Sequence, residues 1–344
     1  MPLPVGKLPA AALARLLGLC REDARVLVRP GIGRDAAALA FGDQVVVAKS
    51  DPITFATDRI GWYAVNINAN DIACLGATPR FFLATLLLPE GKATEEMVET
   101  IFRDVAASCE ALDVTLCGGH TEVTYGLDRP LVVGHMLGEV ARGRLVTNDR
   151  SRAGDDVLLT KGIAIEGTAL IAREKAADLR GAVDAAALER AAGYLDRPGL
   201  SVLPDAAAVC RAARPHALHD PTEGGLATGL HELADAARLG IEVEAEAIAV
   251  FPETQALCRH YRLNPLGLIA SGALLAVTAP ADTPKALEAL AAAGIAARRI
   301  GRMVPRDQGV TIRRGGQVEP LPRFDSDEVA RLFTGSHLHF ALGG

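Results

Sequence analysis

Residues 64–76 read AVNINANDIACLG and place three asparagines and one aspartate among apolar residues. The apolar spacing predicts a helix over residues 60–75, and Gly76 is placed to end it in a left-handed conformation. Asn and Asp favour caps and turns over helix interiors, and burying their polar groups costs free energy unless each finds a partner. Because solvated helix faces usually carry Lys, Glu and Arg, we interpret the polar stripe containing Asn70 and Asp71 as facing a ligand or a buried interface.

Strands and helices alternate on both sides of this helix. In the first half we expect a helix capped by Thr94 and strands at 24–29, 36–41, 44–50, 80–88, 114–117 and 131–138. In the second half we expect helices near 166, 184–194, 202–213 and 223–239, and strands at 156–160, 241–245, 273–278, 296–303 and 309–313. This mixture predicts an α/β fold of two lobes with helices covering the sheets.

The chain has 344 residues, which is more than a single hydrophobic core usually supports, so two domains are expected. The polar run at 148–154 has no periodicity and predicts their boundary. We expect an N-terminal domain over 1–150, a C-terminal domain over 151–335, and a tail over 336–344.

The composition narrows the class of protein. A net charge of -6 without a long basic run argues against a nucleic-acid surface. No apolar run reaches the roughly 18–20 residues that span a bilayer, and residues 1–15 lack the order of a signal peptide. The six cysteines form no Cys-x-x-Cys pair or zinc spacing. We expect a cytoplasmic protein with no membrane partner.

Two short segments place glycine or an acid near strand ends. In residues 31–35, Gly31 and Gly33 allow backbone amides to approach an anion, and Asp35 follows at a position suited to a metal. A hairpin turn explains this segment equally well. Lys49 and Asp51 end an apolar strand, where α/β proteins tend to place ligands, although an ordinary turn is the simpler reading of Asp-Pro taken alone.

Two further segments are dense in polar groups. Residues 117–124 read CGGHTEVT directly after a predicted strand, and a glycine-rich turn is the alternative to a ligand loop. Residues 219–227 read HDPTEGGLA and open a helix, whose first turn presents amides suited to capping or to phosphate. Lys161 is a weaker candidate for a phosphate contact, since a lysine at a strand end often has no such role.

Taken in order over roughly residues 28–310, these segments resemble the aminoimidazole ribonucleotide (AIR) synthetase superfamily, and most of all its HypE branch. The resemblance implies an N-terminal α/β domain that dimerises through its sheet and a C-terminal α/β domain behind it. It also implies an enzyme that binds ATP and Mg²⁺ and transfers the γ-phosphoryl group. The HypE branch implies a role in hydrogenase maturation with a partner protein.

The resemblance also assigns expected roles to individual residues. The metal ligands would be Asp35, Asp51 and Asp71. Catalytic roles would fall to His120, Asp220 and Glu223. The nucleotide would be bound by Gly31, Gly33, Lys49, Asn70, Gly118, Gly119, Thr121 and Lys161.

The chain departs from the HypE pattern at several positions. HypE usually has Asp where His120 stands and commonly Arg where Glu223 stands, and it ordinarily ends in a cysteine, whereas this sequence ends in Gly344. If Gly344 is the true last residue, we expect no HypE-type reaction on the chain's own tail, because a carboxylate does not replace a thiol nucleophile. The leading hypothesis is phosphorylation of an amide-like or carboxylate oxygen. The alternative is a nucleotide-regulated assembly factor with little turnover.

Overall fold

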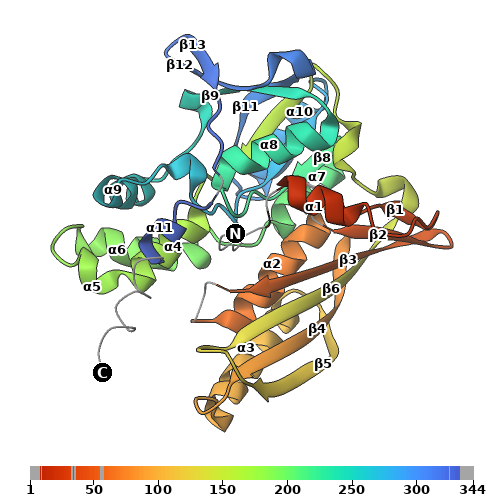
Figure 1. The fold of residues 1–344 in the computed structure, drawn as a ribbon. Helices are drawn as coiled ribbons and strands as arrows, with labels where there is room; N and C mark the ends of the chain where they lie inside the picture. The colour runs from red at the N-terminus through yellow and green to blue at the C-terminus, as the bar shows by residue number, and fades with distance from the viewer. Residues whose placement is uncertain are drawn as a thin grey trace. The chain divides into compact units, whose positions relative to one another are not determined.

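The computed structural model describes residue 8 and residues 10–31, 34, 36–54, 58–324 and 326–333. It divides the chain into two compact units. The N-terminal unit comprises residues 21–30 and 34–147, and the C-terminal unit comprises residues 1–20, 31–33 and 148–344. Each unit contains one sheet with helices, which confirms the expected α/β class (Figure 1). The exact domain bounds of 1–150, 151–335 and 336–344 stay a prediction.

The N-terminal unit is built on a six-stranded sheet in the order β1-β2-β3-β6-β4-β5. All neighbouring strands are antiparallel except β4 and β5, which are parallel. The strands are β1 (Val26–Val28), β2 (Ala37–Phe41), β3 (Gln44–Ile53), β4 (Thr78–Pro89), β5 (Thr115–Thr124) and β6 (Leu131–Ala141).

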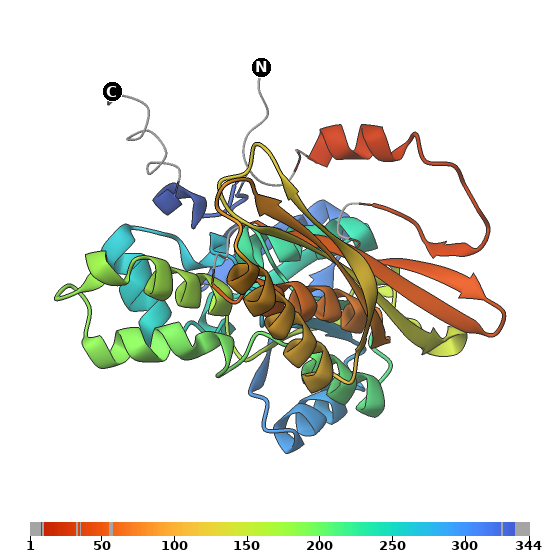
Figure 2. The ribbon, with the colours of Figure 1, turned by 90° about the horizontal axis from the view of Figure 1, so that it is seen from below.

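Helices α2 (Ile60–Cys74) and α3 (Glu95–Ala111) belong to this unit, and α2 contacts β3, β6, β4 and α3 (Figure 2). Glycines allow these contacts to be close. A Cβ at Gly61 would lie 2.6 Å from the Ile101 carbonyl oxygen of α3, and a Cβ at Gly138 would lie 2.3 Å from Ile72 Cγ2 of α2. Gly61 thus lets the two helices approach closely, and Gly138 lets α2 approach the sheet.

The face of the sheet opposite α2 carries half-buried apolar side chains. Alternation along β4 buries Phe82, Ala84 and Leu86, whereas Leu83 and Leu87 are only partly covered and Phe81 is 49% exposed. The same alternation along β3 and β6 leaves side chains such as Val46, Val133 and Leu137 partly covered. The sheet therefore has one face packed against a helix and one apolar face that this chain covers incompletely.

The C-terminal unit contains a seven-stranded sheet in the order β13-β12-β9-β11-β7-β10-β8. In the described part of this sheet, β12 and β9 are parallel, and the other neighbouring strands are antiparallel. The strands are β7 (Asp156–Thr160), β8 (Ala217–His219), β9 (Gly240–Glu244), β10 (Leu275–Thr278), β11 (Ala297–Val304), β12 (Val310–Arg314) and β13 (Gln317–Pro320).

Helix α8 (Gly225–Ala237) supplies Leu226, Leu230 and Leu233 to the core of this unit, where they pack with apolar residues of the strands. The unit's other helices are α1 (Ala10–Leu17), α4 (Ile165–Glu174), α5 (Ala176–Leu179), α6 (Ala185–Ala192), α7 (Leu203–Ala212), α9 (Pro252–Tyr261), α10 (Thr283–Ala292) and α11 (Ala330–Phe333). Among the described residues, no helix is long and apolar enough to cross a membrane.

Several local expectations are confirmed. Helix α2 ends at Cys74, and Gly76 has a φ of 70°. The Thr94 side chain accepts a hydrogen bond from the Met97 amide and caps α3. One expectation is wrong: the strand placed at 114–117 continues to Thr124, so the predicted ligand loop is part of β5.

Candidate functional site

Three of the predicted site residues lie together in the N-terminal unit. The Lys49 Nζ atom is 3.0 Å from Asp71 Oδ2 and 3.5 Å from Asp51 Oδ2. Lys49 and Asp51 are two residues apart on β3, so their side chains share the sheet face that α2 covers, and Asp71 projects from α2. The side chains of Lys49 and Asp71 are 17% and 5% exposed, whereas that of Asp51 is 36% exposed. We call these three residues the Lys49 cluster.

The asparagines of α2 are buried, which excludes the solvent-facing interpretation. Asn68 and Asn70 are fully buried, and Asn66 is 5% exposed. The Asn66 amide donates to the Trp62 carbonyl oxygen at 2.9 Å within the helix. The Asn68 amide donates to the Ala64 carbonyl oxygen at 2.8 Å and also to that of Asp51 at 3.3 Å. One of the asparagines therefore joins the helix to the strand of the Lys49 cluster.

The donor set of the Lys49 cluster fits a hard cation. Its two carboxylates both lie within salt-bridge distance of one ammonium group, and carboxylate oxygens are the ligands that Mg²⁺ prefers. Among the described residues, no three His, Cys, Asp or Glu side chains converge as a metal site. The third expected ligand, Asp35, lies outside those residues, as does Gly33. Gly31 is described and lies outside the helices and strands.

The two glycines of β5 have a structural cause. Gly118 and Gly119 have φ values of 153° and 150°, which favour glycine. A Cβ at Gly119 would lie 1.9 Å from the carbonyl oxygen of Ala84 on β4. The register of the two strands also shifts between Phe82 and Leu83. Position 119 is thus restricted to glycine by the approach of β4, whether or not a ligand binds there.

His120 and Thr121 lie exposed on β5, and His120 Nε2 is 3.0 Å from Glu122 Oε2. The strand register aligns Asp51 with Gly119 across the sheet, so positions 51 and 119 face the same side. His120 is the next residue along β5, and its side chain therefore points to the opposite side of the sheet. Three strand spacings separate β5 from β3, which is about 14 Å. Within one chain, His120 is therefore not part of the Lys49 cluster.

The other two predicted catalytic residues lie in the C-terminal unit, between β8 and α8. Asp220 follows β8 and is 1% exposed, and Glu223 is partly buried. The chain then turns through Gly224 and Gly225, whose φ values are 79° and 65°. A Cβ at Gly225 would lie 2.6 Å from the Leu266 carbonyl oxygen. The paired glycines thus bring α8 close to a neighbouring backbone segment.

A carboxylate from the C-terminal end of the unit binds this turn. Asp327 Oδ2 accepts a hydrogen bond from the Gly224 amide at 2.7 Å, and its Oδ1 accepts one from the Val329 amide at 2.8 Å. Burial raises the pKa of Asp327 to about 6. The sequence predicts that the amides at the start of α8 cap the helix or bind phosphate, and in this structure the Gly224 amide donates to Asp327. No sequence pattern pointed to Asp327, because it lies 103 residues from Gly224.

Lys161, expected to contact nucleotide, is enclosed by its own unit. Its Nζ atom donates to the Ser201 and Gly199 carbonyl oxygens at 2.8 and 3.4 Å and pairs with Asp205 at 3.3 Å. The side chains of Lys161 and Asp205 are 8% and 1% exposed. Burial lowers the pKa of Lys161 and raises that of Asp205. These contacts give Lys161 a structural role in the C-terminal unit.

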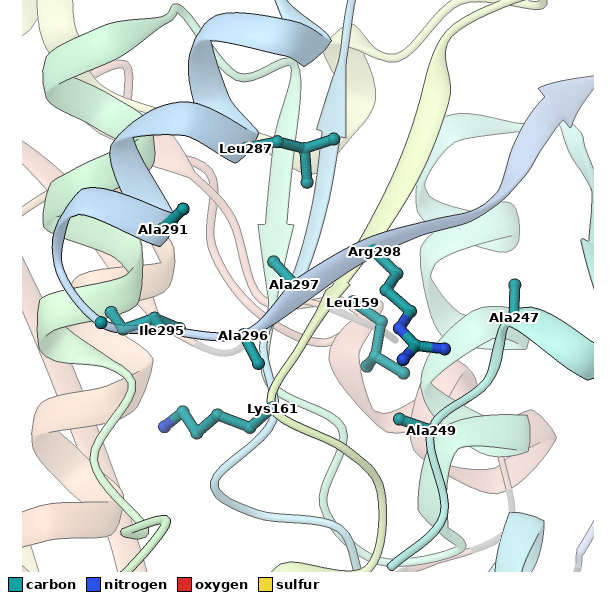
Figure 3. A pocket seen from close by; sticks show the side chains of 11 residues that line it. Leu159, Lys161, Ala247, Ala249, Leu287, Ala291, Ile295, Ala296, Ala297 and Arg298 are labelled. Atoms are coloured by element: carbon teal, nitrogen blue, oxygen red, sulfur yellow. The ribbon is translucent and has the colours of Figure 1, made fainter.

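A pocket of about 470 Å³ is lined by Lys161, Arg298 and mostly small apolar residues. The Lys161 ammonium group extends away from the guanidinium group of Arg298, which also lines the pocket (Figure 3). The charge of Lys161 is directed to Asp205.

Comparison with known proteins identifies the family. The model of the AIR synthase related protein N-terminal domain matches residues 33–140, and that of the C-terminal domain matches residues 152–313. The carbamoyl dehydratase HypE of Rhodobacter capsulatus is 30% identical over 322 residues, which cover 92% of this chain and 88% of that protein. The chain belongs to the AIR synthase-related family.

Other members of the AIR synthase-related family agree with this assignment. A putative hydrogenase expression/formation protein of Methanocaldococcus jannaschii is 27% identical over 310 residues, covering 86% of this chain and 88% of that protein. A crystal structure of HypE in complex with ATP has a TM-score of 0.70 at 22% identity and covers 92% of this chain and 91% of that chain. HypE in a HypE–HypF complex has a TM-score of 0.71 at 23% identity, covering 85% and 94%. These structures establish that the fold is shared.

Proposed function

We propose that this protein is an ATP- and Mg²⁺-dependent enzyme of the HypE type, which phosphorylates an amide-like oxygen during the maturation of a metalloenzyme. The observation that carries the proposal is the Lys49 cluster, found in a chain related to a carbamoyl dehydratase over nearly its whole length. Dehydration of a carbamoyl group to a nitrile removes the elements of one water. Conversion of ATP to ADP and phosphate takes them up, so the reaction balances.

Phosphoryl transfer requires mainly positioning and neutralisation of charge, and the Lys49 cluster offers both. Asp51 and Asp71 would hold Mg²⁺, with Asp35 as a third ligand. Lys49 would then turn from the carboxylates toward phosphate oxygens as a point charge. When bound, Mg²⁺ would supply charge stabilisation at the phosphates. Gly31, Gly33, Asn70, Gly118, Gly119 and Thr121 remain proposed nucleotide contacts.

The roles of His120, Asp220 and Glu223 in catalysis also remain proposals. Asp220 is almost fully buried just before the start of α8. His120 lies on the opposite sheet face from the Lys49 cluster, so a shared site would require groups from a second chain.

We propose a homodimer that forms through the apolar face of the N-terminal sheet, because Phe81, Leu83 and Val133 are incompletely covered there. Exposed apolar surface of this kind marks interaction sites. A partner protein is also proposed, since a HypE relative was crystallised as a HypE–HypF complex. We propose the cytoplasm as the location.

The proposal is tested by titrating the purified chain with ATP in the presence and absence of Mg²⁺ by calorimetry, while phosphate release is followed in the same samples. We expect ATP binding that depends on Mg²⁺, and turnover that rises when a carbamoyl-bearing peptide is added. Failure to bind at millimolar ATP would reject the proposal. Tight binding without phosphate release would instead support the alternative of a nucleotide-regulated assembly factor.

A further inference from the structure

The structure assigns a positioning role to Asn68, which nothing in the family resemblance singles out. Its amide nitrogen donates to the Asp51 carbonyl oxygen at 3.3 Å, in addition to the Ala64 carbonyl oxygen at 2.8 Å. We infer that Asn68 holds the end of β3 against α2 and thereby orients the Lys49 cluster. The expected effect of Asn68 on Mg²⁺ binding rests on the proposed function, whereas its hydrogen bond to Asp51 does not.

The space for this contact is provided by the neighbouring strand. Gly134 of β6 is the register partner of Asp51. A Cβ at Gly134 would lie 2.3 Å from Asn68 Nδ2, so any side chain there would displace the amide. The absence of a side chain at 134 therefore lets Asn68 reach past β6 to the backbone of β3.

The hydrogen bonds of Asn68 also fix which way its amide group points. Because Nδ2 donates to two carbonyl oxygens, Oδ1 must be on the other side of the group. Oδ1 is buried and has no hydrogen-bond partner within the described part of the chain. A buried acceptor without a donor costs free energy, whereas an apolar side chain of similar shape would avoid that cost. Stability alone therefore does not explain an asparagine at position 68.

Asn66 provides a matched comparison two residues earlier. It is also buried, at 5% exposure, and its amide donates to the carbonyl oxygen four residues before it, that of Trp62. No hydrogen bond from Asn66 to a strand is found among the described contacts. The two residues thus share type, helix and local bond, and they differ in the contact with Asp51.

The test compares Asn68→Leu with Asn66→Leu in the full-length chain. Mg²⁺ is titrated by calorimetry into each protein saturated with a non-hydrolysable ATP analogue. We expect Asn68→Leu to weaken Mg²⁺ binding roughly tenfold, as the loss of a group that orients a metal ligand does. We expect Asn66→Leu to bind as the wild type does. The melting temperature of Asn68→Leu should not fall below that of Asn66→Leu.

Hydrogen–deuterium exchange of the segment 49–53 provides a second readout that needs no ligand. Exchange there should become faster in Asn68→Leu and stay unchanged in Asn66→Leu. If the wild type binds no Mg²⁺, the proposed function fails and the exchange rates alone decide the role of Asn68. Equal changes in both variants, or none in Asn68→Leu, would overturn the inference while leaving the proposed function intact.

Discussion

Lys49 and Lys161 are the two lysines that the sequence marks as candidate phosphate contacts, and their surroundings differ. Lys49 lies between two carboxylates, one of which is 36% exposed. Lys161 is enclosed by two backbone carbonyl oxygens and a carboxylate that is 1% exposed. The Lys161 ammonium group thus has all three of these contacts within the C-terminal unit. Lys161 is therefore held by its own unit, whereas Lys49 has a partner, Asp51, that is partly open to solvent.

The largest effect is expected for Lys161→Met, which leaves the Asp205 carboxylate buried without its cation. Loss of one partner of a buried ion pair costs about 3–5 kcal/mol. The measurement is urea unfolding of the full chain, followed by the transition of the C-terminal unit. Combining Lys161→Met with Asp205→Leu should recover most of the loss. A single variant as stable as the wild type would show that Lys161 is not structural.

The next effect concerns activity in the N-terminal unit. The double variant Asp51→Asn and Asp71→Asn should reduce Mg²⁺-dependent phosphate release at least about 100-fold, since it removes the charges that position the cation. The fold should persist, as judged by circular dichroism. Asp113→Asn serves as the control, because the Asp113 side chain is 98% exposed. Unchanged turnover in the double variant would place the reaction elsewhere.

A third effect is a pH dependence of stability that arises from Asp327. Its pKa of about 6 in the folded chain lies above the ordinary value of 3.8. The folded chain thus binds this proton more tightly than the unfolded chain, so the contribution is present below about pH 4 and is lost as pH rises through about 6. The full shift corresponds to roughly 3 kcal/mol at most.

Asp327→Asn tests this dependence. We expect the stability of the wild type relative to the variant to decrease as the pH rises from 4 to 7, measured by chemical denaturation at several pH values. Other titrating groups cancel in the difference between the two proteins. A difference that does not change with pH would mean that Asp327 is not protonated in this range.

The smallest effect sharpens the contrast between the two lysines. In Lys49→Met the carboxylates of Asp51 and Asp71 lose the cation between them, so added Mg²⁺ should stabilise this variant more than the wild type. At about ten times the dissociation constant the gain is roughly 1.4 kcal/mol. The measurement is the melting temperature with and without Mg²⁺. Lys161→Met should show no such recovery, and equal gains in both variants would remove the distinction.

The sequence predicted well those elements that are rich in apolar residues and end at a recognisable residue. The helix over 60–75 and the strand over 156–160 were confirmed closely, because each has a clear apolar pattern and a clear end. The strand β5 was predicted too short, since Gly118 and Gly119 indicate a turn in sequence. In the structure, their positive φ values accommodate the shifted register with β4.

The candidate site was predictable in part. Lys49, Asp51 and Asp71 were chosen from strand ends and from a polar helix, and the structure brings them together. The contacts of Asp327 and Asn68 were not predictable, because each depends on a partner distant in sequence. The sequence shows which residues are costly to bury, but the partner that offsets that cost is visible only in three dimensions.

Gly119 limits how β5 of this protein can be changed. A methyl group there would overlap the Ala84 carbonyl oxygen, so no other amino acid fits without moving β4. In a saturation library selected only for correct folding, position 119 should retain glycine, while the exposed neighbours His120 and Thr121 should accept many residues. The polar side chains of this strand, and any reaction that uses them, can therefore be altered by substitution at His120 and Thr121, while Gly119 must be kept.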